Sequence, residues 1–171
     1  LKGKKIRVQQ SPTNVKMMQA FGAAAAPMSF GEVYTAIQSG VIDGGENNEL
    51  ALTNNKHGEV AKYYTYNQHQ MVPDLLIGNL KFLNGLSPEE RQVFDEAAEL
   101  ATKVEREQWS VATNKAIEQA KEMGVQFIET DVQAFKQKVL PLHKELLSEN
   151  PKLKPIYDSI QKVNDEVKEM K

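Results

Sequence analysis

The sequence predicts an α/β fold with a parallel sheet, followed by long helices, on three observations. Short strand and helix patterns alternate through residues 5–48, which is the order of a parallel sheet covered by helices. A helical repeat of apolar residues then runs unbroken from residue 88 to residue 123. Finally, the 171 residues are 40% hydrophobic and 26% charged, so we expect a soluble protein with its own core.

Three strands are expected in the first part of the chain. Residues 6–10 alternate apolar and polar side chains, and residues 11–14 supply turn and cap residues before a helix at about 15–21. Residues 23–28 predict the second strand. Ser29 is expected to cap the next helix, which Gly40 ends, and residues 41–43 predict the third strand.

The middle of the chain is expected to add a helix, a strand and then one very long helix. The first helix is predicted to run through Val60, Ala61 and Tyr64, and Pro73 interrupts the predicted strand at 71–77. Residues 87–90 form a capping box with proline at the first helical position. The helix that follows is roughly 54 Å long at 1.5 Å per residue, so we expect it to touch more than one structural unit.

The end of the chain predicts a strand at 125–128 and two helices. Pro141 falls inside the first of these helices, and Pro151 and Pro155 separate the two. We expect the charged residues 165–171 to fray.

Composition excludes several classes of function. The net charge is −2, without the basic patch that binds nucleic acid or an anionic membrane. The chain has no cysteine, which removes disulfides, thiolate metal sites and cysteine nucleophiles and fits an exported protein. There is no apolar run of the roughly 20 residues that span a bilayer and no signal-peptide pattern. Because the sequence opens abruptly at Leu1, we expect a fragment or a trimmed product.

Candidate binding residues fall at the predicted strand ends, where parallel sheets bind ligands. Arg7 offers a planar set of donors that matches a carboxylate, and Gln9 shares its face of the strand, with Gln10 next to it. Asn47 could donate an amide hydrogen bond to the same anion, and Phe30 could stack on the ligand. Three of these residues have simpler alternatives: Arg7 could be an exposed strand arginine, Asn47 a turn residue and Phe30 a core aromatic.

Catalytic and cofactor patterns are weak. His57, His69 and His143 lack the spacing of zinc ligands. Residues 43–46 lack the glycine spacing and the lysine of a phosphate loop. Asp74 could accept bonds from ligand hydroxyls or could be an exposed loop residue. We therefore expect no catalytic residue, cofactor or metal.

Three stretches together carry a resemblance: Lys5-Ile-Arg-Val-Gln9, Ala26-Pro-Met-Ser-Phe-Gly-Glu-Val-Tyr-Thr-Ala-Ile-Gln38 and Gly40-Val-Ile-Asp-Gly-Gly-Glu-Asn47. They closely resemble the substrate-binding subunits of tripartite ATP-independent periplasmic (TRAP) transporters. Glu59-Val-Ala-Lys-Tyr63, His69 and Leu86-Ser-Pro-Glu-Glu90 continue the likeness over nearly all of the chain.

The resemblance implies the second lobe of a two-lobed periplasmic binding protein-like fold, with a long domain-spanning helix and C-terminal helices. Residues 1–80 would form the ligand-binding lobe, residues 81–171 would form the long helix, a short strand and the C-terminal helices, and the N-terminal lobe would be absent. By similarity, Arg7 grips a ligand carboxylate, Asn47 donates a second bond to it, and Phe30 packs on the ligand. Gln10, His69 and Asp74 would line the cleft.

The departures from the family pattern concern the ligand. Asn48 stands where many members have proline, which adds a polar group near the cleft and favours a sugar acid, such as a uronate or an aldonate, over a four-carbon dicarboxylate. The resemblance implies a solute-binding protein outside the cytoplasm, periplasmic or lipid-anchored, that delivers an organic acid to TRAP membrane subunits. The alternatives are an enzyme that uses His69 and Asp74 as acid and base, and a sensory or assembly module. Surface made for the missing lobe is expected to favour self-association.

Overall fold

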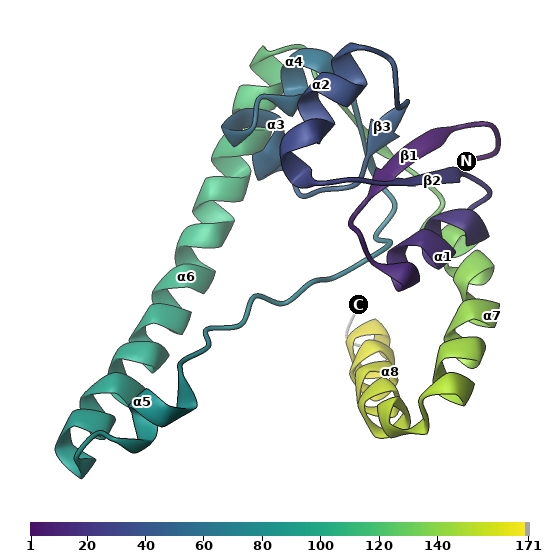
Figure 1. The fold of residues 1–171 in the computed structure, drawn as a ribbon. Coiled ribbons are helices and arrows are strands. Elements are labelled where there is room, and N and C mark those ends of the chain that lie inside the picture. The colour runs from purple at the N-terminus through teal and green to yellow at the C-terminus, as the bar shows by residue number, and fades with distance from the viewer. Residues whose placement is uncertain (170–171) are drawn as a thin grey trace. The chain divides into compact units, whose positions relative to one another are not determined.

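The computed structural model describes residues 1–169, with side chains through residue 167, and the chain divides into two compact units (Figure 1). The first unit contains residues 1–46 and the chain from residue 131 onward, and the second contains residues 47–130. This division differs from the expected boundary at residue 80. The α/β fold with one very long helix and C-terminal helices is confirmed.

The sheet of the first unit has three parallel strands in the order β2-β1-β3. Strand β1 (Lys5–Val8) is central, between β2 (Ala24–Pro27) and β3 (Gly44–Gly45). Helix α1 (Pro12–Ala20) connects β1 to β2, and the short helices η1 (Phe30–Glu32) and α2 (Val33–Gln38) connect β2 to β3. This order places the carboxyl ends of all three strands at one edge of the sheet.

The third strand lies at 44–45, so the prediction of a strand at 41–43 was wrong. The backbone N–H groups of Val41 and Ile42 donate to the carbonyl oxygen of Ala36 at the end of α2. Bonds to a helix end therefore take the place of strand pairing there. The next N–H, that of Asp43, donates to the Lys5 carbonyl oxygen and begins the approach to β1.

The core of the first unit ties the C-terminal helices to the sheet. Val8 is fully buried and packs with Met18 of α1 and Leu142 of α7 (Val132–Glu149). The ring of Phe21 meets that of Phe135 edge-on at 5.1 Å between centroids. Because α7 packs on α1, the chain beyond residue 130 belongs with the first sheet.

The last helices follow the predicted proline pattern. Pro141 lies inside α7, the short helix η2 (Pro151–Leu153) follows, and α8 runs from Lys154 to Glu169. Residues 165–169 are helical, so the fraying expected there was wrong. Residues 170–171, which belonged to the same expectation, lie outside the described residues.

The second unit is built on a parallel pair of strands and the long helix. Helices α3 (Leu50–Asn54) and α4 (His57–Val60) lead into strand β4 (Tyr63–Tyr66), which pairs with β5 (Gln126–Glu129). The predicted helix through Tyr64 was therefore wrong. Ala61 is extended and ends α4, and the aromatic and β-branched residues at 63–66 favour a strand.

Helix α6 (Pro88–Glu122) confirms the prediction of one long helix. Ser87 and Glu90 form its capping box, and Ala120 packs with Leu52 of α3 and with Val125. Helix α5 (Leu80–Asn84) precedes it, and the rings of Phe82 and Phe94 meet edge-on. No helix in the described part of the chain has both the length and the apolar character needed to cross a membrane.

The predicted strand at 71–77 was wrong. Residues 70–79 have no regular structure and are exposed. Proline at position 73 cannot donate to a sheet, and the pairing of β4 with β5 accounts for the strands of the second unit.

Large apolar side chains are exposed along residues 71–111, which we name the exposed apolar segment. Met71 is 94% exposed and Ile77 is 85% exposed. The others are Val72, Leu75, Leu76, Leu80, Phe82, Val93, Phe94, Leu100, Val104, Trp109 and Val111.

Candidate functional site

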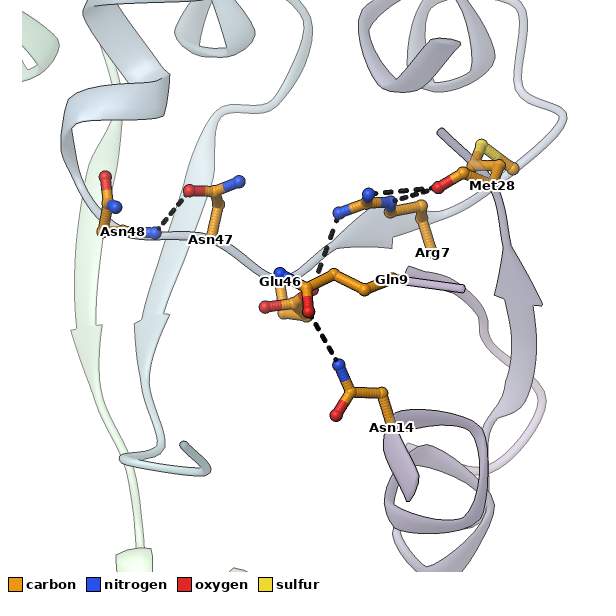
Figure 2. A network of polar contacts seen from close by, with 7 residues as sticks. All are labelled: Arg7, Gln9, Asn14, Met28, Glu46, Asn47 and Asn48. Carbon is orange, nitrogen blue, oxygen red and sulfur yellow. Dashed lines mark hydrogen bonds and ion pairs between the residues drawn. The ribbon is translucent and has the colours of Figure 1, made fainter. Parts of the chain in front are cut away.

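The candidate site forms where the three strands of the first sheet end. Gln9 follows β1, Met28 follows β2 and Glu46 follows β3. Arg7 lies in the middle of β1, opposite Ala26 and Gly45, and its guanidinium reaches toward the residues that follow both neighbouring strands (Figure 2).

The Arg7 side chain is buried and held by two contacts. Its Nε and Nη2 atoms both donate to the Met28 carbonyl oxygen, at 3.2 and 3.0 Å. Its Nη1 atom lies 3.6 Å from Glu46 Oε1, an ion pair whose side chains are 5% and 14% exposed. The sequence left open the alternative of an exposed arginine, which is wrong, because the neighbouring strand ends enclose the side chain.

Gly45 lies close against the stem of Arg7. A Cβ atom built on Gly45 would lie 3.5 Å from Arg7 Cβ and 3.6 Å from a methyl group of Val33. An alanine there would make ordinary van der Waals contact with both side chains.

Phe30 lies beside the guanidinium and remains 40% exposed, which separates it from the alternative of a core aromatic. Arg7 Cζ is 5.9 Å from the centroid of its ring, within the range of a cation–π contact. The turn that carries Phe30 is fixed by a capping box between Ser29 and Glu32. Hydrogen bonds from the Ser29 hydroxyl and backbone N–H lower the pKa of the Glu32 carboxyl.

Gln9 and Gln10 follow Arg7 and are both exposed. The Gln9 side-chain oxygen accepts a hydrogen bond at 3.2 Å from the amide of Asn14, a buried residue of α1. Gln9 is thereby held at the strand end, whereas Gln10 makes no hydrogen bond within the described residues.

Asn47 begins the second unit and follows Glu46 directly. Its Oδ1 atom accepts from the backbone N–H of Asn48 at 2.8 Å (Figure 2). Because only an oxygen can accept this bond, the Asn47 NH₂ group keeps both hydrogens for other acceptors. Asn48 Oδ1 accepts from the Leu50 N–H at the start of α3, so the side-chain oxygen at this departure from the family pattern is already engaged by the backbone.

Tyr64 of β4 fixes the backbone of Asn47. Its hydroxyl donates to the Asn47 carbonyl oxygen at 2.9 Å. Its ring lies 5.2 Å from that of Tyr66 and 5.5 Å from that of Phe127, measured between centroids. Burial, with the nearby charge of Glu49 and a hydrogen bond to it, raises the pKa of Tyr66 to about 12, so Tyr66 is uncharged at neutral pH.

His69 and Asp74 are the remaining predicted residues. His69 Nδ1 lies 2.6 Å from Asn67 Oδ1. Since that amide oxygen only accepts, Nδ1 is the donor in this contact. Asp74 lies in the exposed stretch and makes no hydrogen bond or ion pair within the described residues. No hydrogen bond or ion pair joins the two residues within the part of the chain that the structure describes.

The structure thus groups Arg7, Gln9 and Phe30 in the first unit, and Asn47 and Asn48 in the second. Sequence reasoning missed two participants. Glu46 could have been found because a buried arginine needs a counter-charge. Tyr64 could have been found from the β-favouring composition of residues 63–66. No group of three histidine or acidic side chains suited to a metal occurs in the part of the chain that the structure describes.

Known proteins match this chain closely. The family model described as "Bacterial extracellular solute-binding protein, family 7" matches residues 1–150. A TRAP periplasmic solute-binding protein of Anaerococcus prevotii, solved with bound glucuronate, is 59% identical with a TM-score of 0.91, over 97% of this chain and 54% of that one. A counterpart from Xanthobacter autotrophicus, solved with bound galacturonate, is 39% identical with a TM-score of 0.87, over 94% of this chain and 53% of that one.

Curated relatives match the chain over a similar extent. An uncharacterized protein of Salmonella typhimurium is 40% identical over 162 residues, which are 94% of this chain and 49% of the relative. The chain spans about half the length of the curated relatives it matches. With the family model covering residues 1–150, the chain belongs to family 7 of the bacterial extracellular solute-binding proteins, the family of the TRAP transporter binding subunits.

Proposed function

We propose that the full-length protein captures a small organic acid outside the cytoplasm, with a uronate favoured, and delivers it unchanged to the membrane subunits of a TRAP transporter. The family supports binding without chemistry. Two similar proteins were solved with glucuronate and galacturonate, respectively. Both ligands carry one carboxylate and several hydroxyls, which is the class that the polar character of Asn48 favours.

The buried guanidinium of Arg7 carries this proposal. Burying an arginine that is 4% exposed on a central strand lowers the stability of the fold. Its guanidinium lies at the carboxyl ends of the strands, where parallel sheets bind ligands. Its Nε–Nη2 edge is bound to the Met28 carbonyl oxygen. The Nη1–Nη2 end is the second pair of parallel donors, and we assign the ligand carboxylate to it.

The other site residues take complementary roles. The NH₂ group of Asn47, left as a donor by the bond to Asn48, gives the carboxylate a second hydrogen bond. Phe30 presents an exposed ring for the apolar face of a sugar. Gln9, Gln10 and Asn48, together with His69 and Asp74, supply polar groups for hydroxyls.

Delivery requires a change of state on binding. We assign residues 1–80 to the ligand-binding lobe and α6 to the element that spans lobes. Closure is then a population shift, whose extent is set by how much more tightly the ligand binds the closed state. The membrane subunits would recognise that closed state.

A thermal-shift screen of the full-length protein tests the proposal. D-glucuronate, D-galacturonate, an aldonate, a keto acid and a C4 dicarboxylate are compared with neutral glucose. A ligand that binds only the folded state raises the free energy of unfolding by mass action, by about 2.7 kcal/mol at a hundredfold excess over Kd, and the melting temperature rises with it. We expect the uronates to give the largest shifts and glucose none. Equal shifts for glucose and glucuronate, or none for any acid, would rule out carboxylate capture.

We also propose that the 171-residue chain by itself associates with further copies. Monomeric soluble proteins rarely expose contiguous apolar surface on the scale of the exposed apolar segment. The occupant in our proposal is the same segment of a second copy.

A further inference from the structure

A buried amide, that of Asn14, lies next to the candidate site. Asn14 belongs to α1 and is 6% exposed. Its Nδ2 atom donates a hydrogen bond at 3.2 Å to the side-chain oxygen of Gln9, the residue that follows β1 (Figure 2). Burying an amide is unfavourable unless it is hydrogen-bonded, so this contact stabilises Asn14 where it lies. The partner, however, is an exposed residue of the site, so the contact also acts on the site.

Gln9 is fixed at both its backbone and its side chain. Its carbonyl oxygen accepts a hydrogen bond at 2.7 Å from the backbone N–H of Ser11, and its side-chain oxygen accepts from Asn14. A glutamine that is free on a surface samples many rotamers, and ordering it when a ligand arrives opposes binding. Because Asn14 already holds the side chain in the protein without ligand, that opposition is reduced.

The same contact decides which end of the Gln9 amide remains for a ligand. The Asn14 Nδ2 group can only donate, so the atom that it meets is the Gln9 oxygen. The Gln9 NH₂ group keeps both of its hydrogens and makes no hydrogen bond within the described residues. Gln9 is therefore a hydrogen-bond donor at the strand end, two residues beyond Arg7. Such a donor suits an oxygen atom of a ligand.

We propose that Asn14 is a positioning residue, which holds Gln9 as a fixed hydrogen-bond donor for an oxygen atom of the sugar acid. The inference rests on the proposed function and assigns one polar contact of its ligand. Asn14 acts through Gln9 and does not touch the ligand. A purely structural Asn14 would affect binding whether or not Gln9 is present, whereas a positioning residue acts only while Gln9 is there.

A double-mutant cycle on the full-length protein tests this, with titration calorimetry and D-glucuronate as the ligand. Asn14→Leu removes the donor at similar volume. Its effect on the dissociation constant is measured once with Gln9 present and once in a Gln9→Ala background. We expect the loss of affinity to be about fivefold larger with Gln9 present. A ratio of the two losses below two would overturn the inference.

A second variant covers the case in which the leucine protein does not fold. Asn14→Asp keeps the shape of the side chain and removes the donor. Its added negative charge acts on the ligand in both backgrounds and cancels in the ratio of the two losses, so the same threshold applies.

The matched control uses the neighbouring exposed glutamine, Gln10, as the background. In Gln10→Ala, the Asn14→Leu change should weaken binding by the same factor as it does when both glutamines are present. A coupling of Asn14 to Gln10 as large as its coupling to Gln9 would mean that Asn14 shapes the whole strand end. That result would overturn the specific positioning of Gln9.

The outcomes separate the two levels of the proposal. Wild-type protein that binds glucuronate, with a ratio of losses near one, would remove the role of Asn14 and leave acid capture intact. Wild-type protein that does not bind glucuronate would contradict the uronate favoured above, and the role of Asn14 would fail with it.

Discussion

The two units differ in which unfavourable side-chain placement they contain: a buried charge in the first, and exposed apolar side chains in the second. The first unit buries a charged group, Arg7, and offsets its burial with a carbonyl oxygen and a carboxylate. The second exposes large apolar side chains from Met71 to Val111. At the buried Arg7 site, the position of each side chain depends on internal packing, so substitutions should change folding and binding together. In the exposed apolar segment, substitutions should leave folding nearly unchanged and alter association.

The largest effect on stability is expected at the buried ion pair. Arg7→Ala leaves the Glu46 carboxylate without its counter-charge in a site that is mostly closed to water. Removing one partner of a buried pair lowers the free energy of unfolding by about 3–5 kcal/mol. Chemical denaturation of the full-length protein measures this. Lys4→Ala, which breaks an exposed pair with Asp43 on the same sheet, should have only a small effect. Equal losses would contradict the comparison.

The same substitution can be made in both units, because each has a methionine in the environment that is compared. Met18 is 3% exposed in the first core and Met71 is 94% exposed. Met18→Ala leaves a cavity and should lower the free energy of unfolding by about 2–5 kcal/mol. Met71→Ala should change it by less than about 0.5 kcal/mol. A destabilisation at Met71 that approached that at Met18 would show that the exposed segment is packed in solution.

A smaller effect is expected where the second unit holds Asn47. Tyr64→Phe removes the donor to the Asn47 carbonyl oxygen while the ring stays in the aromatic cluster. The lost bond should lower the free energy of unfolding by about 1 kcal/mol and weaken acid binding severalfold. Unfolding curves and calorimetry report the two changes. Tyr63→Phe, at an exposed position of the same strand, should change neither, and unchanged binding in Tyr64→Phe would remove its positioning role.

The smallest effect on folding is expected in the exposed apolar segment. Replacing Leu75, Leu76 and Ile77 by serine should leave the melting temperature of the 171-residue chain almost unchanged. Because less apolar surface would be buried between copies, the self-association constant should fall by at least about tenfold. Sedimentation over a range of concentrations measures this.

The matched control replaces three exposed polar residues of the first unit, Lys2, Gln19 and Gln38, by serine. It should leave association as it is. A wild-type chain that stays monomeric at every concentration would contradict the proposed self-association.

Features set by local chemistry could be predicted from the sequence. The long helix was predicted nearly to its ends because a capping box with Pro88 starts it and Gly124 follows its last turn. Strand β1 was predicted from alternation, and β2 from the short apolar stretch at residues 23–28. The grouping of Arg7, Gln9 and Phe30 followed from the rule that parallel strands end at one edge.

Features set by distant partners could not be predicted in this way. Whether Arg7 is exposed depends on Met28 and Glu46, which are 21 and 39 residues further along the chain. Tyr64 is a strand residue because β5 pairs with it from more than 60 positions away. The segment 71–77 has the composition of a strand but no partner of this kind within its unit. Burial and pairing are properties of the assembled fold, and no local pattern encodes them.

The account depends most on the Arg7 guanidinium as the group that receives a ligand carboxylate. Titration calorimetry of the full-length protein with D-glucuronate, wild type against Arg7→Lys, tests this directly. A lysine keeps the charge but cannot hold Met28 and a carboxylate with two parallel pairs of donors. We predict that affinity falls more than tenfold, whereas equal affinity in the two proteins would contradict the account.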